Sequence, residues 1–137
     1  MNKRLKAEYI NLPSIKDVRG SLTFAESTNH IPFDIKRIYY LHGVPEGGAR
    51  GGHAHKNLTQ AIFALSGSFR LTLDNGVSKG KFVLDDPTKG ILIRNNVWRE
   101  LDCFSPNTVC LVFASEYFSE SDYIRDYQIF QNLVCDK

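Results

Sequence analysis

The sequence predicts an all-β protein, a closed barrel of the jelly-roll kind with one short helix near its C-terminal end. Three observations predict this class: many short apolar segments, turn residues between them, and a single stretch with helical spacing. The chain has 137 residues, enough for one substantial core, and no repeat, linker or low-complexity tract divides it. We therefore expect residues 1–137 to form a single domain.

The predicted strands follow one another along most of the chain. Residues 69–74 alternate apolar and polar side chains, as a half-buried strand does. Asn75 and Gly76 come next, and both residue types accept the positive φ of a type I′ turn, so a hairpin is expected there. Residues 85–87 and 105–107 indicate two further reversals. The expected strands are 7–11, 22–26, 35–41, 61–65, 68–73, 79–84, 90–93, 97–102 and 108–114.

One segment near the C-terminal end has the spacing of a helix. Ser121 is placed to cap it. The apolar side chains that recur at helical spacing are Tyr123, Ile124, Tyr127, Phe130, Leu133 and Val134. We expect this stripe to be a packing face, either against the barrel or against a partner subunit.

Composition excludes several classes of function. The net charge is +2 and no run of five like charges occurs, so neither nucleic-acid nor membrane-surface binding is expected, although a small basic pocket for an anionic ligand is allowed. Residues 1–6 are basic, but no apolar stretch follows them, so we expect no signal peptide. Cys103, Cys110 and Cys135 lack the CxxC spacing of zinc sites, and an odd number argues against a disulfide framework. A reducing cytoplasm is the expected location.

The segment 47–60 carries the candidate site. His53 and His55 are two residues apart, so on a strand both side chains point to the same face and into one cavity. Where an anionic ligand would normally complete a metal site, the chain has the uncharged amide of Gln60. The two histidines of a typical metal site are therefore present, but its carboxylate is absent.

These residues resemble a known motif. The spacing Gly47-x5-His53-x-His55-x4-Gln60-x6-Gly67 resembles the first cupin motif, with glutamine in place of the usual glutamate. Residues 87–99 resemble the second cupin motif, with Arg99 where that motif has a histidine. A divalent cation prefers imidazole and carboxylate ligands, so both departures weaken metal binding. The resemblance implies a cupin-type jelly roll, and we expect neither a metal nor another cofactor in it.

A narrower resemblance covers nearly the whole chain. In segments 19–22, 35–40, 50–56, 97–98 and 123–127 the sequence resembles the bacterial nucleotide-sugar 3,4-ketoisomerases, cupin enzymes that convert dTDP-4-keto-6-deoxyglucose to its 3-keto isomer. The resemblance implies a metal-independent isomerase and a homodimer that exchanges N-terminal strands. It also implies a role in making deoxyaminosugars for surface polysaccharides such as lipopolysaccharide.

Two imidazoles suit the chemistry that this resemblance implies. Moving a carbonyl to the adjacent carbon requires a proton to leave one carbon and another to reach its neighbour through an enediolate. An imidazole has an unperturbed pKa of about 6.5, so it can accept and donate protons near neutral pH. We assign movement of the carbon-bound proton to His53, and relay of protons between the two sugar oxygens to His55.

Arginine and tyrosine side chains complete the predicted site. Arg50 is a catalytic candidate, for stabilising the enediolate or for binding the pyrophosphate. Tyr39 and Tyr40 point to opposite faces of a strand, so only one can face the barrel. The resemblance implies a catalytic tyrosine in this pair. We favour Tyr40 for this role and assign Tyr39 to substrate binding.

Substrate binding is also assigned to Gln60, Arg99 and Arg19, although Arg19 could equally brace a turn. Arg99 resembles the corresponding residue of family members whose 3-keto product has the glucose configuration.

Two other classes of function remain open from the sequence. One is a metal-dependent cupin enzyme in which His53 and His55 are ligands. The other is a sugar-binding cupin without catalytic activity, in which the same pair only hydrogen-bonds a ligand.

Overall fold

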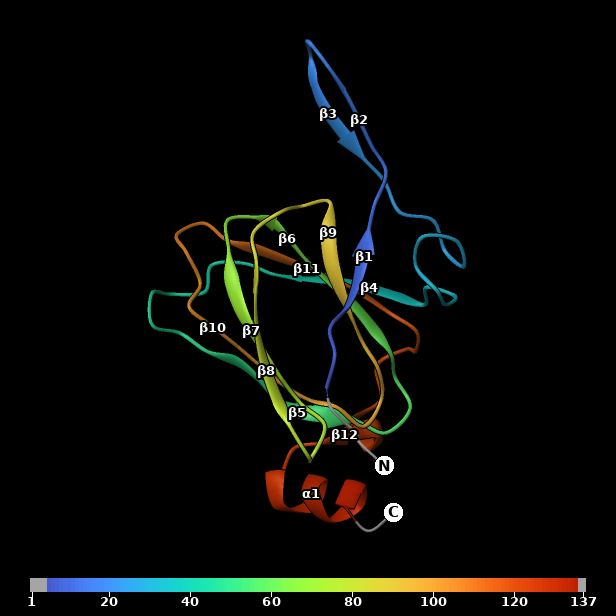
Figure 1. The fold of residues 1–137 in the computed structure, drawn as a ribbon, viewed down its shortest axis with the longest axis vertical. Coiled ribbons are helices and arrows are strands. Elements are labelled where there is room, and N and C mark those ends of the chain that lie inside the picture. Colours follow the sequence, from blue (N-terminus) through green and yellow to red (C-terminus); the bar gives the residue numbers. More distant parts are fainter. Residues whose placement is uncertain (1–4, 136–137) are drawn as a thin grey trace.

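The computed structural model describes residues 5–135, which form two five-stranded sheets facing one another (Figure 1). The strand order is β1-β9-β6-β11-β4 in the first sheet and β12-β5-β10-β7-β8 in the second, and β2 and β3 form a separate hairpin. The bounds are β1 Glu8–Asn11, β2 Ser14–Asp17, β3 Gly20–Thr23, β4 Arg37–Leu41, β5 Arg50–His55, β6 Gln60–Ser66, β7 Phe69–Asp74, β8 Lys79–Leu84, β9 Lys89–Ile93, β10 Trp98–Asp102, β11 Val109–Ala114, η1 Glu120–Asp122, β12 Tyr123–Ile124 and α1 Tyr127–Cys135.

The main core fills the space between the two sheets. Leu71 and Leu73 of β7 are buried there, while the intervening Thr72 is only half-buried, which is the alternation expected from the sequence. Ile62 and Val112 enter the same cluster from the facing sheet. A second cluster, centred on Ile31, lies on the outer face of the first sheet. Burying each such aliphatic side chain contributes roughly 1.5–3 kcal/mol, so both clusters stabilise the arrangement of the strands.

Most predicted strands are present within a few residues of their expected bounds, and 79–84 coincides with β8. The prediction at 22–26 is wrong in its bounds, because β3 spans Gly20–Thr23 and pairs with β2. Strand β2 was not predicted. All four of its residues are exposed, so no buried face imposes an apolar pattern on it.

The hairpin between β7 and β8 is confirmed, but its connection is wider than a two-residue type I′ turn. Asp74 pairs with Lys79, which leaves residues 75–78 in the loop. Of these loop residues only Gly76 has a positive φ, of 92°, and its N–H is bonded to the Asp74 carboxylate.

The helix begins later than the sequence indicated. Tyr123 and Ile124 form β12 and pair with β5, so their backbone groups belong to the sheet. Asp126 rather than Ser121 caps α1, since its carboxylate accepts a hydrogen bond from the N–H of Ile129 at 3.1 Å. Phe130 is fully buried against the end of the second sheet, and Tyr127 and Val134 pack beside it, whereas Leu133 is 43% exposed, so only part of the stripe packs on the barrel.

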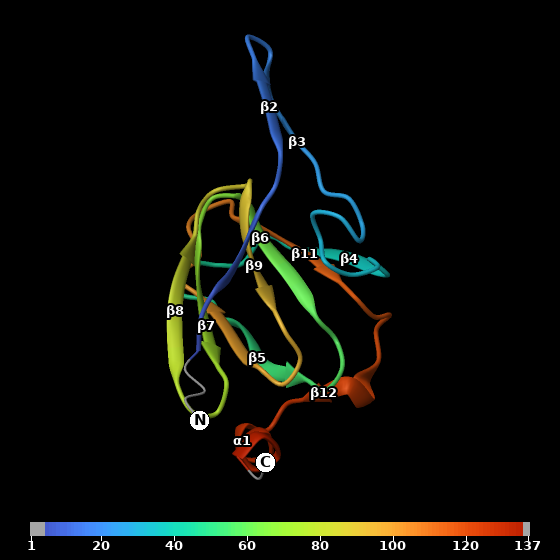
Figure 2. The same ribbon diagram turned by 45° about the vertical axis from the view of Figure 1, so that its right-hand side comes forward.

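The β2–β3 hairpin extends away from the two sheets, at the end opposite α1, in both views (Figures 1 and 2). Its apolar side chains Ile15, Val18 and Leu22 are exposed. In the described part of the chain, no helix is both long and apolar enough to cross a membrane.

Candidate active site

Two glycines shape β5 where it enters the site. Arg99 pairs with His53 and Glu100 with Gly51, so Gly52 is an extra residue that forms a bulge. Gly51 and Gly52 have φ values of +86° and +76°, a region that favours glycine. A Cβ on Gly51 would lie 2.9 Å from the carbonyl oxygen of Arg99. Gly51 and Gly52 therefore let β5 approach β10 closely just before His53.

A cavity of about 460 Å³ opens beside this bulge. Its wall combines both sheets with the segment that follows β11. The lining residues are Arg37, Tyr39, Leu41, Ala49, Arg50, Gly51, His53, Gln60, Ile62, Ile93, Arg99, Leu101, Val112, Phe118, Tyr123 and Arg125. Four of these are arginines and none is a carboxylate. The cavity is thus suited to an anionic ligand.

The two histidines lie together but differ in exposure. Their ring centres are 4.9 Å apart, and Tyr123 packs on both rings. His53 lines the cavity, whereas the side chain of His55 is 0% exposed. Burial and the charge of Arg99 lower the pKa of His53 to about 3 and that of His55 to about 4. Both imidazoles are therefore neutral at neutral pH and able to accept a proton.

A buried polar network forms the floor beside them. Arg99 is only 2% exposed, and its guanidinium donates to the Gln60 amide oxygen. The Gln60 amide nitrogen donates in turn to the Tyr39 hydroxyl at 3.0 Å. Burial lowers the pKa of Arg99 to about 10, which still leaves it charged at neutral pH, and burial raises the pKa of Tyr39. The network fixes a cation and a phenol at the cavity wall.

The residues at the cupin ligand positions do not fit a divalent metal. Gln60 offers a neutral oxygen that is already bonded to Arg99, and Arg99 itself would place a cation beside another cation. Among residues 5–135, no group of three or more histidine, cysteine, aspartate or glutamate side chains lies close enough to hold a metal ion.

Tyr39 and Tyr40 lie on opposite faces of β4. Tyr39 lines the cavity, but Tyr40 is 60% exposed on the outer face of the first sheet, beside His42. The register explains this, because Tyr39 pairs with Val112, which points inward. The expectation that Tyr40 faces the site is therefore not met in this chain.

Of the other predicted site residues, Arg50 lies at the cavity and Arg19 does not. Arg50 lines the cavity at the start of β5. Arg19 lies on the β2–β3 hairpin, away from the cavity lining, with its side chain 87% exposed and paired with Asp17 at 2.7 Å.

Four residues at or beside the cavity are not predicted from the sequence. Arg37 lines the cavity, yet its Nε and Nη2 are buried and lack a hydrogen-bond partner among the described residues. Tyr123 was read as part of a helical stripe, and Arg125 stacks on its ring at 4.1 Å. Asp122 bonds to His55 at 3.0 Å. The histidine spacing carries no information about Asp122, which lies 67 residues away.

The protein is a barrel of the cupin class, as its two facing sheets and the paired histidines on β5 indicate. Two of the positions that usually hold metal ligands carry instead an amide, Gln60, and a guanidinium, Arg99. The sequence matches the family described as FdtA: WxcM-like, C-terminal over residues 5–135, so the chain belongs to this family.

Known proteins of the same kind are similar to the chain over almost all of its length. It is 41% identical to the TDP-4-oxo-6-deoxy-alpha-D-glucose-3,4-oxoisomerase of Aneurinibacillus thermoaerophilus, covering 96% of this chain and 94% of that one. A mutant of the 3,4-ketoisomerase QdtA from Thermoanaerobacterium thermosaccharolyticum, solved in complex with TDP-4-keto-6-deoxyglucose, has a TM-score of 0.93 with 38% identity, covering 96% and 95% of the two chains.

The WlaRB TDP-quinovose 3,4-ketoisomerase of Campylobacter jejuni has a TM-score of 0.88 with 40% identity, covering 92% of this chain and 97% of that one. The fold is a cupin-type jelly roll, as the sequence predicted, and the chain is an enzyme of the isomerase class. This membership argues against the sugar-binding cupin without catalytic activity.

Proposed function

We propose that this enzyme converts dTDP-4-keto-6-deoxyglucose to the corresponding 3-keto sugar. The observation that carries the proposal is the placement of His53, a neutral imidazole, in the wall of a carboxylate-free cavity beside the buried guanidinium of Arg99. A base and a fixed cation are the two groups that enediolate chemistry requires. The similar QdtA structure, which contains TDP-4-keto-6-deoxyglucose, supports the choice of substrate.

His53 takes the proton from the hydroxyl-bearing carbon and returns a proton to the neighbouring carbon, which began as the carbonyl. During the same step the hydroxyl proton of the first carbon must reach the oxygen of the second. His55 is the second imidazole next to His53, and we assign this transfer to it. The net change is an isomerisation, so no oxidant or reductant is consumed.

Arginine and tyrosine side chains of the cavity bind two parts of the substrate, the reacting oxygen and the diphosphate. Arg99 and the Tyr39 hydroxyl lie beside Gln60 in the wall, where they stabilise the enediolate oxygen. Arg37 and Arg50 bind the diphosphate, because guanidinium groups pair well with phosphate oxygens. The buried Nε and Nη2 of Arg37 have no hydrogen-bond partner in the described part of the chain. This supports the role, since buried donors without partners are costly unless a ligand satisfies them.

We further propose that no metal or other cofactor takes part, because Arg99 and Gln60 do not suit a divalent cation. Turnover should then be unchanged after treatment with a chelator. Loss of activity on chelation, restored by one added metal, would favour the metal-dependent cupin instead.

The glucose configuration of the product is part of the proposal. Arg99 is buried at the cavity wall, where it can act on the face of the enediolate that is protonated. The 40% identity to a TDP-quinovose 3,4-ketoisomerase supports this assignment, since quinovose is a 6-deoxyglucose.

We also propose a homodimer that exchanges N-terminal strands and a cytoplasmic role in making deoxyaminosugars for lipopolysaccharide. The exposed apolar residues of the β2–β3 hairpin, Ile15, Val18 and Leu22, support a second copy as its partner. Cys103, Cys110 and Cys135 are free thiols, which fits a reducing compartment.

The test is an NMR-followed reaction of the purified enzyme with dTDP-4-keto-6-deoxyglucose, in which a 3-aminotransferase of known stereochemistry traps the product. We expect a 3-amino-3,6-dideoxyglucose product. The His53→Asn variant should turn over at least ~10²-fold more slowly, because a general base typically contributes this much. Unchanged substrate with wild-type enzyme, or a His53→Asn rate within tenfold of wild type, would refute the proposal or the role of His53, respectively.

A further inference from the structure

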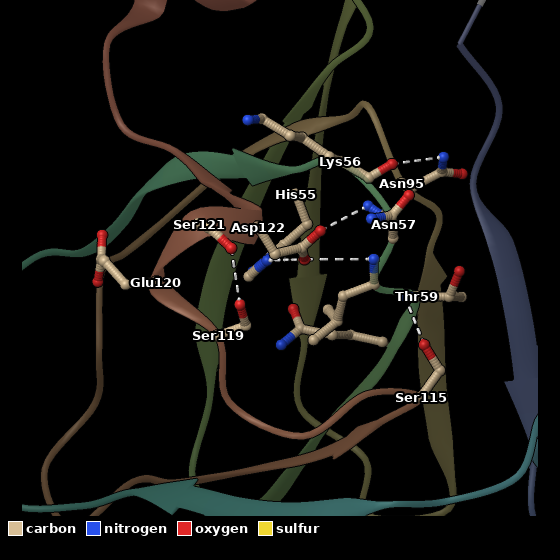
Figure 3. Close-up of polar contacts among 12 residues, drawn as sticks. His55, Lys56, Asn57, Thr59, Asn95, Ser115, Ser119, Glu120, Ser121 and Asp122 are labelled. Atoms are coloured by element: carbon tan, nitrogen blue, oxygen red, sulfur yellow. Dashed lines mark hydrogen bonds and ion pairs between the residues drawn. The ribbon is translucent and has the colours of Figure 1, made fainter.

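Three nitrogen atoms lie within hydrogen-bond distance of the carboxylate of Asp122. Its Oδ1 accepts from the N–H of Asn57 at 2.8 Å, and its Oδ2 accepts from the N–H of Leu58 at 3.3 Å. The third neighbour is the imidazole of His55, whose Nδ1 lies 3.0 Å from Oδ2. Figure 3 shows Asp122 reaching from the end of η1 to the segment that follows β5.

These contacts determine which ring nitrogen of His55 carries the proton. A carboxylate only accepts hydrogen bonds, so Nδ1 must be protonated to donate to it. In the neutral ring Nε2 then has a free lone pair. Nε2 is buried and has no hydrogen-bond partner in the described part of the chain.

We propose that Asp122 is a positioning residue that locks His55 in the Nδ1–H tautomer and so presents Nε2 as the proton acceptor of the second imidazole. The inference rests on the proposed function, in which His55 moves a proton between sugar oxygens. Neither Asp122 nor His55 is among the residues that line the cavity, so Asp122 acts through the ring of His55, which packs against His53 in the cavity wall. The backbone N–H groups of Asn57 and Leu58 hold the carboxylate in place.

Asparagine at this position should reverse the tautomer. The side-chain oxygen of an asparagine can face only one side, and the closest fixed donor is the N–H of Asn57 at 2.8 Å. The amide NH2 then faces Nδ1 of His55 and can donate only if Nδ1 gives up its proton. The ring proton moves to Nε2, which becomes a donor and can no longer accept a proton.

The experiment compares Asp122→Asn with wild type by long-range ¹H–¹⁵N NMR of the histidine rings and by steady-state kinetics. We expect a change of His55 from Nδ1–H to Nε2–H, a fall in kcat on the order of 10²-fold, and a KM within about threefold of wild type, because the cavity lining is unchanged. Asp126→Asn is the matched control, since it removes the same charge nearby and asparagine caps a helix as well as aspartate. This control should behave as wild type.

Two results would overturn the inference: an unchanged tautomer in Asp122→Asn, or a changed tautomer with kcat close to wild type. If Asp122→Asn does not fold, Asp122→Glu gives the second test, because it restores an acceptor and should keep the Nδ1–H tautomer. The NMR measurement needs no substrate, so it still decides the tautomer if the wild-type enzyme fails to isomerise the sugar and the proposed function itself is wrong.

Discussion

His53 and His55 are both partly or fully buried next to the guanidinium of Arg99. Arg99 lies close to both rings, and the carboxylate of Asp122 lies 3.0 Å from Nδ1 of His55. Burial is the largest cause that lowers the pKa of each ring, and Arg99 adds to it. The site thus keeps two proton acceptors available where free histidines would be partly protonated.

The acid side of the pH profile should reflect these lowered pKa values. The base must be unprotonated to accept a proton, and with pKa values of about 3 and 4 both rings remain neutral down to that range. We expect kcat/KM to be flat through pH 6.5 and to fall only as the pH approaches 4. A loss of half the activity near pH 6.5 would contradict this environment for His53.

Stability must be followed in the same experiment. In the unfolded chain both histidines have pKa values near 6.5, so below that pH the unfolded state binds more protons than the folded state. The free energy of unfolding therefore decreases as the pH falls from about 6.5 towards 4. Circular dichroism at each pH separates lost folding from lost chemistry.

Arg37 should contribute to binding rather than to proton transfer. Its guanidinium lies 5.3 Å from the centre of the Tyr39 ring and 5.7 Å from that of Phe118, and its Nε and Nη2 have no hydrogen-bond partner within residues 5–135. In Arg37→Met we expect the affinity for TDP to fall roughly tenfold or more, since a hydrogen bond to a charged group contributes about 1.5–3 kcal/mol. Titration calorimetry with TDP and with thymidine measures this, and thymidine binding should not change.

Arg94→Met is the control for that titration, because Arg94 lies outside the cavity lining and pairs with Glu8 at 2.8 Å. Equal TDP affinity in Arg37→Met and wild type would show that the diphosphate binds elsewhere.

At the scale of elements, the bulge in β5 is the feature that brings the histidines to the cavity. Gly51→Ala would combine a positive φ with a Cβ only 2.9 Å from backbone of β10. We expect a loss of about 3 kcal/mol in the free energy of unfolding, from backbone strain and overpacking together. Gly43→Ala has a similar φ of +68° but open space around the added Cβ, so it should cost only about 1 kcal/mol.

Urea unfolding of both variants gives the comparison. Equal losses in Gly51→Ala and Gly43→Ala would mean that the close approach of β5 to β10 does not constrain the site.

The sequence could predict those elements whose pattern is set by a buried face. Strand β7 alternates because one side packs in the core, and α1 shows its stripe because Phe130 packs on the barrel. Strand β2 has no buried side, and β12 is a strand because it pairs with the distant β5. Neither strand therefore shows an alternation of apolar and polar residues in the sequence. Because the pairing of Tyr123 with β5 cannot be recognised from the sequence, its spacing predicts a helix there.

For the candidate site, the sequence predicts the residues whose placement depends on strand geometry alone. The spacing of His53 and His55 depends only on strand geometry, so it could be read directly. The choice between Tyr39 and Tyr40 depends on the register with β11, which the alternation alone does not give. Asp122 and His55 are brought together only by the fold, because 67 residues separate them. Arg37 becomes a candidate only because the folded structure leaves two of its buried nitrogens without a partner among the described residues.

At the scale of the whole molecule, the extended β2–β3 hairpin should complete the site of a second copy (Figure 1). We expect a dimer by light scattering. We also expect Arg19→Ala and His53→Asn chains to be inactive alone, yet to recover about a quarter of wild-type activity when mixed, because random pairing makes half the molecules mixed dimers with one intact site each. A monomer, or no recovery on mixing, would contradict strand exchange with Arg19 in the partner's site.

We propose that this barrel performs proton transfer at carbon, and exchange with solvent deuterium measures that transfer in the sugar itself. The enzyme is incubated with dTDP-4-keto-6-deoxyglucose in D2O, and the sugar is followed by ¹H and ²H NMR. We predict that the carbonyl moves to the adjacent carbon, that deuterium enters the ring at the carbon that was the carbonyl, and that His53→Asn abolishes both changes. A substrate that is bound but stays unchanged, with no deuterium in its ring, would contradict the claim.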